Sequence, residues 1–366
     1  METDDQARNG SYGSDARASG TLYVQLKRAL FHLGKGLGFF HLARRLTRDA
    51  LRILCYHGFS LADESQFRPR LFMEVATFRK RLEYLSRKGF SVLSLDEALD
   101  CLDSGTLPPH STVITIDDGF YSVYLHAAAL LREFSFPATL YFATYDSPRE
   151  QPVFRLAVQY MFWKTKKEHL NLHGLFDGRD EKLFLEAGAE KDRTMWEIIQ
   201  HGETQRNEEQ RQSLAEELGR RLGLDYHDMV TKRLLGLMNP QEIQQIAAAG
   251  IDVQLHTHRH NFPEDEAMAT REIQDNRNAL LPLVKNSLRH FCYPSGIWSK
   301  KHWPWLEAVG IRSATTCEPG FNYRDTPRLG LKRFLDGEHI MPIEFEAEMT
   351  GFSELLRRAR NLFRSP

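Results

Sequence analysis

The chain has 366 residues, of which 42% are hydrophobic and 27% charged, and its formal net charge is −1. This size allows one large hydrophobic core or two modest ones, and the near-neutral charge gives no general signal for nucleic-acid binding. The four cysteines are scattered without a CxxC pair, and no apolar run reaches the roughly 18 residues of a membrane-spanning helix. We therefore expect a reducing compartment, without disulfides or a thiolate zinc site.

The N-terminal region falls into two parts. Residues 1–20 are polar and rich in Gly and Ser, which predicts a disordered tail. Residues 21–50 form a basic amphipathic segment without an acidic residue before Asp49, and leucines recur in it at near-helical spacing. Two interpretations of residues 21–48 stay open: a segment lying on an anionic membrane surface, or a helix packed on the domain with its basic face in water.

Strand and helix patterns alternate from residue 51 onward. Short apolar runs predict strands at 51–56, 90–95, 113–116, 138–143, 251–255, 290–293, 312–316 and 331–334. Asn239-Pro240-Gln241-Glu242 is typical of a helix start, with Asn at the N-cap and Glu three residues later. This alternation predicts a parallel α/β architecture, in which a site forms at the carboxyl ends of the strands.

One long segment interrupts the alternation. Residues 146–238 are charged and mostly helical in pattern, with no obvious strand, and we interpret them as a helical insertion. The predicted division therefore comprises a tail (1–20), the basic segment (21–50), the first part of a barrel (51–145), the insertion (146–238), the second part of the barrel (239–345) and a C-terminal helix (346–366).

Two adjacent aspartates follow the predicted strand at 113–116. Asp117 and Asp118 are followed by Gly119, which lets the chain turn closely around a bound group. One carboxylate can ligate a metal while its neighbour reaches a water. The alternative is a surface turn or a helix N-cap, because Asp-Asp-Gly is common where strands end.

Three histidines follow the predicted strand at 251–255. The four-residue spacing of His256 and His260 lets two imidazoles converge on one ion, whereas His258 between them points away. The alternative is a loop of polar histidines. Because these residues and the aspartates follow strands of one parallel sheet, the sequence predicts a divalent metal site equipped for hydrolysis.

With these motifs, the sequence resembles the polysaccharide deacetylase family, carbohydrate esterase family 4. Residues 115–119 (Thr-Ile-Asp-Asp-Gly) match its first motif, Thr-Phe-Asp-Asp-Gly, and residues 256–260 (His-Thr-His-Arg-His) match its second, His-Ser/Thr-x-x-His. Residues 56–58 (Tyr-His-Gly) resemble the start of the bacterial exopolysaccharide branch, and the turn at 293–296 resembles the third motif. The resemblance implies an irregular (β/α)7 barrel, here with a helical insertion.

The resemblance also implies roles for individual residues. Asp118, His256 and His260 would hold a divalent metal, which we expect to be Zn²⁺. Asp117 would be the general base. The backbone N–H of Ser295 would stabilise the oxyanion.

The sequence departs from the family where the catalytic acid and the arginine that orients the base are expected. The final Leu-x-Leu-His motif is replaced by Leu-Gly-Leu-Lys at 329–332, so His57 is our candidate acid and His339 a second. Arg333, on a later strand, is a candidate for the missing arginine. We also expect Tyr293, Pro294 and Arg333 to contact the substrate.

The expected function is metal-dependent hydrolysis of N-acyl groups on the amino sugars of a polysaccharide or glycan precursor, including a lipid-linked sugar. The alternatives are hydrolysis of another non-peptide C–N or ester bond, and a catalytically silent metal- or glycan-binding scaffold in polysaccharide assembly. We expect a cytoplasmic protein that does not bind nucleic acid. Membrane binding by residues 21–48 would place it peripherally at the inner face of the membrane.

Overall fold

The computed structural model of the chain describes residues 14–176, 181–186 and 188–362. Its centre is a parallel sheet of β1 (Arg52–Tyr56), β5 (Ser111–Ile116), β6 (Thr139–Phe142), β9 (Asp252–Leu255), β10 (His290–Cys292), β11 (Ser313–Thr315) and β12 (Phe334–Leu335). These strands pair in the order β11-β10-β9-β6-β5-β1-β12, and β4 (Ser91–Val92) pairs with β5. A parallel bridge between Thr315 and Leu331 joins the two ends of the sheet. The predicted parallel barrel is confirmed.

The central strands are covered on both faces, which explains their composition. Every residue of β5, Ser-Thr-Val-Ile-Thr-Ile, is buried, as is every residue of β1. The two strands run in register, with Leu54 beside Ile114 and Tyr56 beside Ile116. Strands buried on both faces of a parallel sheet are expected to be rich in β-branched residues. Because β1 and β5 end together, His57 and Asp117 emerge at the same edge.

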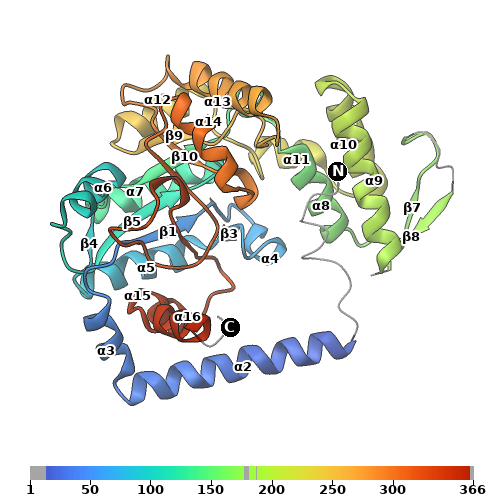
Figure 1. Cartoon of the computed structure of the whole chain (residues 1–366). Coiled ribbons are helices and arrows are strands. Elements are labelled where there is room, and N and C mark those ends of the chain that lie inside the picture. The colour runs from blue at the N-terminus through green and yellow to red at the C-terminus, as the bar shows by residue number, and fades with distance from the viewer. Residues whose placement is uncertain (1–13, 177–180, 187, 363–366) are drawn as a thin grey trace.

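Helices pack around this sheet: α5 (Val75–Arg87), α6 (Leu95–Ser104), α7 (Ala128–Glu133), α12 (Pro240–Ala248), α13 (Glu266–Leu280) and α14 (Trp303–Ala308) (Figure 1). The predicted capping box of α12 is present. The Glu242 N–H donates to Asn239 Oδ1 over 2.9 Å, and the Asn239 N–H donates to Glu242 Oε2 over 2.8 Å. This cap begins the helix that precedes β9.

Two of the predicted strands differ from the observed ones. The run at 90–95 is a strand only over β4, because the Ser94 side chain accepts from the Glu97 N–H and caps α6. The run at 331–334 shifts to β12. Three further short elements, α4 (Glu64–Phe67) and the pair β2 (Gly58–Phe59) and β3 (Phe72–Met73), lie in the connection that follows β1.

The interrupting segment stands to one side of the sheet in Figure 1. Its described part contains α8 (Phe154–Lys164), α9 (Ala189–Gln205), α10 (Glu208–Leu222) and α11 (Tyr226–Thr231). It also contains an antiparallel hairpin of β7 (His169–Asn171) and β8 (Lys182–Phe184). The expectation of a segment without strands was therefore wrong: these strands have three residues each and the mixed polar composition of a surface ribbon.

Two helices precede the barrel, α2 (Ser14–Gly36) and α3 (Phe39–Leu46), and they pack on α15 (Pro342–Met349) and α16 (Phe352–Leu362) (Figure 1). The predicted tail lies outside the described residues up to position 13, and residues 14–20 belong to α2 instead. Phe31 and Phe40 are buried against Phe352, and a side chain at Gly34 would come within 2.8 Å of the Phe352 ring. No helix among the described residues is long and apolar enough to cross a bilayer.

Candidate functional site

The structure brings Asp118, His256 and His260 together at the carboxyl ends of β5 and β9. The Nε2 atoms of both histidines lie 3.2 Å from Asp118 Oδ1. One ligand atom from each residue lies within 4.8 Å of the other two, a spacing that fits a shared metal ion. His256 is buried, Asp118 is half-buried and His260 is exposed, so the cluster opens to solvent on one side.

The orientation of His256 identifies which of its nitrogens faces the cluster. Its Nδ1 lies 2.8 Å from the Cys292 carbonyl oxygen, and a carbonyl can only accept, so Nδ1 carries a proton. In the neutral imidazole, Nε2 then directs a lone pair at Asp118 Oδ1. Two acceptors at this distance need a proton or a cation between them. The carbonyl therefore fixes His256 in the tautomer that a metal ligand requires.

A buried amide that the motifs do not include holds the same strand end in place. Asn276 of α13 accepts from the backbone N–H of His256 over 2.9 Å. Its own side-chain N–H groups donate to the Phe142 carbonyl and to Thr144 Oγ1. Asn276 thereby ties β9 to β6. The sequence offered one signal for this role of Asn276: it is a polar residue on the inner face of an amphipathic helix, where an apolar residue is expected.

The backbone at both ligand motifs adopts the left-handed conformation. Asp118, Thr257 and His260 have φ values of 68°, 61° and 51°, which are uncommon for residues with a side chain. Gly119 has φ 92°, and a Cβ atom there would lie 2.1 Å from Phe142. Only glycine fits this position, so the conformation that presents Asp118 depends on Gly119.

Asp117 points into the sheet and forms a two-point ion pair with Arg333. Arg333 Nη1 and Nη2 donate to the two carboxylate oxygens over 2.7 and 2.8 Å. The Arg333 side chain is fully buried, and Asp117 is 3% exposed. Burial alone raises the pKa of Asp117, but the charge and hydrogen bonds of Arg333 outweigh it and lower this pKa to about 2. Asp117 is therefore ionised throughout the physiological range.

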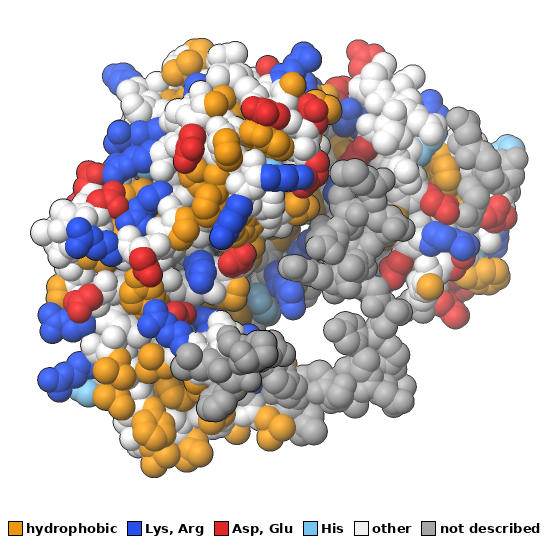
Figure 2. Space-filling view, viewed as in Figure 1, with side chains coloured by type: hydrophobic (Ala, Val, Ile, Leu, Met, Phe, Trp, Pro, Cys, Tyr) orange, Lys and Arg blue, Asp and Glu red, His pale blue; other side chains and the backbone are white. Residues whose placement is uncertain are grey.

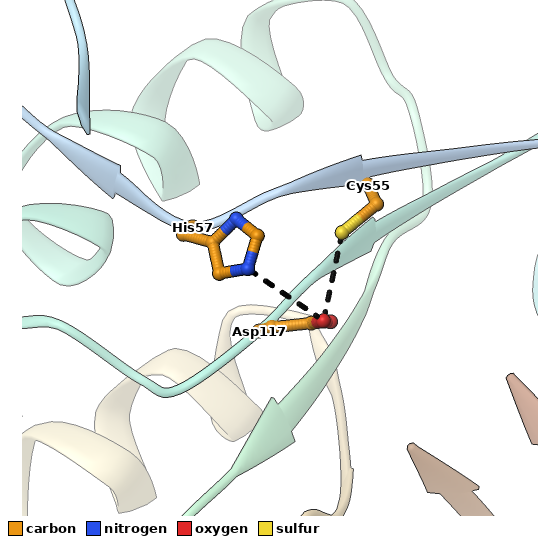
Figure 3. Close-up of side chains that lie close together, drawn as sticks. All are labelled: Cys55, His57 and Asp117. Carbon is orange, nitrogen blue, oxygen red and sulfur yellow. Dashed lines mark hydrogen bonds and ion pairs between the residues drawn. The ribbon is translucent and has the colours of Figure 1, made fainter. Parts of the chain in front are cut away.

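Three more side chains surround the Asp117 carboxylate, two of them shown with it in Figure 3. The thiols of Cys55 and Cys292 lie 3.5 and 3.3 Å from Oδ2, and burial raises the pKa of both well above the usual thiol range. They remain neutral donors. His57 Nε2 lies 3.9 Å from the same oxygen, and the His57 side chain is 17% exposed to solvent. Among these side chains, His57 is the one that solvent reaches.

The turn after β10 contains the residue predicted to supply an oxyanion contact. Ser295 is exposed and has φ 55°, and it follows Cys292, whose carbonyl binds His256, by three residues. Tyr293 and Pro294 are buried, and the Tyr293 hydroxyl donates to the Leu329 carbonyl over 3.0 Å. The expectation that Tyr293, Pro294 and Arg333 contact the substrate is corrected: all three are enclosed by packing.

Two further histidines lie outside the cluster. His258 turns away, as expected, with its Nδ1 2.8 Å from Thr144 Oγ1. His339, the second candidate for the acid, is exposed in the loop after β12, and its Nδ1 lies 3.2 Å from the Pro69 carbonyl oxygen. It is not part of any cluster of ligating groups around Asp117 or Asp118 in the described chain.

Both ends of the inserted segment contact the loops that carry the metal-site residues. The Tyr145 N–H donates to the His258 carbonyl over 2.8 Å. At the other end, the Met238 N–H donates to the Gly119 carbonyl over 3.0 Å, and the Tyr121 N–H to the Gly236 carbonyl over 2.9 Å. The insertion therefore begins and ends beside Asp118 and the histidine loop, as its place in the sequence indicated.

A comparison with protein families adds an independent finding. A family model described as polysaccharide deacetylase matches residues 208–314, which include the histidine motif and the turn after β10. The predicted resemblance to the polysaccharide deacetylase family is thereby confirmed. A search of curated protein sequences gave no match.

Solved structures share the fold at low sequence identity. Streptococcus pyogenes deacetylase PplD in complex with acetate has a TM-score of 0.53 and 15% identity, over 83% of this chain and 99% of that one. IcaB from Ammonifex degensii has a TM-score of 0.51 and 17% identity, over 83% and 97%. BC0361, a polysaccharide deacetylase from Bacillus cereus, has a TM-score of 0.51 and 15% identity, over 82% and 69%.

Proposed function

We propose that this protein is a metal-dependent hydrolase that removes N-acetyl groups from the amino sugars of a polysaccharide or of a glycan precursor, including a lipid-linked one. The family match supports deacetylation of a polysaccharide. The main support for the proposal is that a set of metal ligands and an ionised carboxylate lie at the same edge of the sheet. Asp118, His256 and His260 converge on one point, and the ionised Asp117, held by Arg333, directly precedes Asp118 in the sequence.

The donor set fits a divalent ion. One carboxylate oxygen and two imidazole nitrogens are ligands that Zn²⁺ accepts at a catalytic site, where further positions stay open for water and substrate. The Nε2 atoms of both histidines lie 3.2 Å from Asp118 Oδ1, so the three groups face one another as ligands of a shared ion do. When bound, such an ion polarises the acyl oxygen and lowers the pKa of a water.

The remaining steps fall to the chain's own residues. Asp117 accepts the proton of the attacking water, while Arg333 fixes the carboxylate. The N–H of Ser295 stabilises the negative charge that develops on the acyl oxygen. The C–N bond then breaks, and His57 donates a proton to the departing amine. Acetate and a free amino sugar are the products. His57 Nε2 lies 3.9 Å from an Asp117 carboxylate oxygen, beside the group that takes the proton of the water.

One observation opposes the alternative of a catalytically silent scaffold. A metal or glycan site needs only the three ligands, yet the structure also maintains a buried two-point ion pair at Asp117. Removing charges from water is costly, and this pair keeps an ionised carboxylate next to the metal ligands, where a general base is needed. Hydrolysis of a different C–N or ester bond stays the second candidate, because the same groups act on any acyl carbon.

We place this activity in the cytoplasm. All four cysteines are free thiols, and two of them surround the proposed general base. A reducing compartment keeps such thiols unmodified. Their contact with Asp117 Oδ2 depends on the neutral S–H form.

The proposal is tested by incubating the purified full-length protein with N-acetylglucosamine oligosaccharides and measuring released acetate and free amine. Activity should require Zn²⁺ or another divalent ion and should disappear with a chelator. His258→Ala is the matched control, because this histidine belongs to the same loop but bonds to Thr144. Metal-replete protein that releases no acetate from any N-acetylated glycan, yet cleaves another acyl substrate, would establish the second candidate.

A further inference from the structure

The N-terminal helices present a second apolar face, opposite to their packing against α15 and α16. Phe31, Phe40 and Ala43 point to the domain. Seven other large apolar side chains of the same helices are exposed by 47% to 64%: Leu26, Leu30, Leu33, Leu37, Phe39, Leu42 and Leu46. Figure 2 shows hydrophobic side chains gathered at the lower left, over the corner between α2 and α3. Areas of this kind mark binding surfaces.

The spacing of these residues shows that they form one stripe. Positions 26, 30 and 33 recur at four and three residues along α2, which places them on one side of the helix. Leu37 continues this spacing just after the helix ends, where its N–H donates to the Leu33 carbonyl. Positions 39, 42 and 46 repeat this pattern along α3. No acidic residue occurs between positions 21 and 48. An apolar stripe in a basic helical segment without acidic residues has the composition of a segment that lies in a membrane interface.

A basic hollow adjoins this stripe. It has a volume of about 310 Å³ and is lined by His41, Arg44, Arg45, Arg48, Pro109 and His110. Among the described side chains of α2, Lys27 and Arg28 share the carboxylate of Glu344, and Lys35 pairs with Glu346. In the hollow, Arg48 contacts the exposed Asp49 over 3.2 Å, and Arg44 donates to the Lys88 carbonyl. Arg45 has no hydrogen-bond or ion-pair partner among the described residues.

His110 reports the electrostatic environment of this hollow. Burial and the charges of Arg44, Arg52 and Arg48 lower its pKa to about 4, so it is neutral at physiological pH. Burial is the larger cause of this shift, and the same arginine charges that add to it attract an anion. The hollow therefore offers several guanidinium donors to a phosphate group, beside side chains that match an acyl-chain boundary.

We propose that α2 and α3 form a docking surface for an anionic phospholipid membrane, with the leucine stripe in the acyl boundary and the arginine hollow on lipid phosphates. Charge argues against a second copy of the chain as the occupant, because this face would bring two basic clusters together. The rigid seating of α2 on Phe352 fixes the stripe relative to the barrel. The protein then acts from the membrane surface, and this conclusion does not depend on which bond it hydrolyses.

The test is cosedimentation of the full-length protein with phosphatidylcholine vesicles, with and without phosphatidylglycerol. Wild-type protein should bind only the anionic vesicles, and raised salt should weaken binding. Leu33→Glu with Leu42→Glu should reduce binding more than tenfold. Arg45→Ala with Arg48→Ala should reduce it by about fivefold for each arginine. All four side chains are exposed, so circular dichroism should show an unchanged fold.

Matched controls are Phe184→Glu with Leu281→Glu, which are exposed by 64% and 54% on other parts of the molecule, and Arg132→Ala with Arg271→Ala. These variants should bind like wild type. The proposal is overturned if wild-type protein ignores anionic vesicles, or if the stripe and hollow variants bind as well as the controls. A wild-type dimer that the stripe variant dissociates, without vesicle binding by either protein, would assign the surface to a second copy instead.

Discussion

Replacing Arg333 by methionine removes the guanidinium that binds both oxygens of Asp117, while a side chain of similar length still fills the space. The structure allows the free energy of this interaction to be calculated from the pKa of Asp117. The pKa of Asp117 falls from 3.8 to about 2, which corresponds to about 2.5 kcal/mol of interaction between the folded protein and the charged form. Because the pair is buried and the variant leaves a carboxylate without its partner, we expect a loss of about 3 kcal/mol at pH 7.

The pH dependence of this loss gives the prediction its specific form. In wild type the depressed pKa of Asp117 contributes stability above its unfolded value of about 4, and that stability disappears as the pH falls towards about 2. In the variant, burial is no longer countered by Arg333, so the pKa of Asp117 rises above its usual value. Acidification then protonates Asp117, and the difference in unfolding free energy between variant and wild type should shrink as the pH falls from 7.

Urea denaturation of metal-free protein between neutral and mildly acidic pH measures this difference, and acetate release with added Zn²⁺ measures turnover. Arg81→Met is the control, since Arg81 makes a buried two-point pair with a different carboxylate, that of Asp336. It should lose stability but retain turnover, whereas Arg333→Met should lose turnover by about a hundredfold. A stability deficit of Arg333→Met that does not change with pH, or turnover equal to that of Arg81→Met, would refute the reasoning.

Three other predictions concern the metal, the aspartates and the insertion. His256→Ala with His260→Ala should abolish binding of the single divalent ion measured by elemental analysis, and stoichiometric metal in that variant would contradict the ligand assignment. Asp118→Ala should lose metal and turnover together, whereas Asp117→Asn should keep the metal and lose turnover, because an amide cannot accept the proton; near-normal turnover would exclude Asp117 as the base. Replacing the insertion that carries α8–α11 by a short linker should alter substrate preference more than metal content; unchanged kinetics on every glycan tested would show that it does not form a wall of the substrate cleft.

The sequence predicted the parts of this site that local pattern encodes. The strand before Asp117 and the strand before His256 are short, apolar and followed by turn residues, and both lie where expected. The helix cap at Asn239 could also be predicted, because its two hydrogen bonds join residues that are three apart in the sequence. In each case the determining interactions lie within a few residues, or follow from the rule that parallel strands end at one edge.

The parts that the sequence did not predict depend on contacts between distant residues. Arg333 is separated from Asp117 by 216 positions. It was our candidate for the arginine that orients the base, but nothing local in the sequence distinguished that role from the substrate contact that we also expected of it. Residues 14–20 have a composition typical of a flexible tail. They form the first turns of α2, whose helix packs on α15 and leads into α3, which packs on α16. Ser94 was a missed local signal: a serine three residues before a glutamate is a helix start, and the apolar run around it concealed this.

The left-handed residues of the site have a consequence for any attempt to make this protein more robust. Nine residues other than glycine have positive φ in the described chain, and Asp118, Thr257, His260 and Ser295 are four of them. Thr257 is the least suited, because its branched side chain crowds the backbone there, at about 1–3 kcal/mol. Asparagine tolerates this conformation and can still accept from the Asn261 N–H as Thr257 Oγ1 does. Thr257→Asn should therefore raise the stability of the protein while it keeps the loop conformation that holds the histidines together.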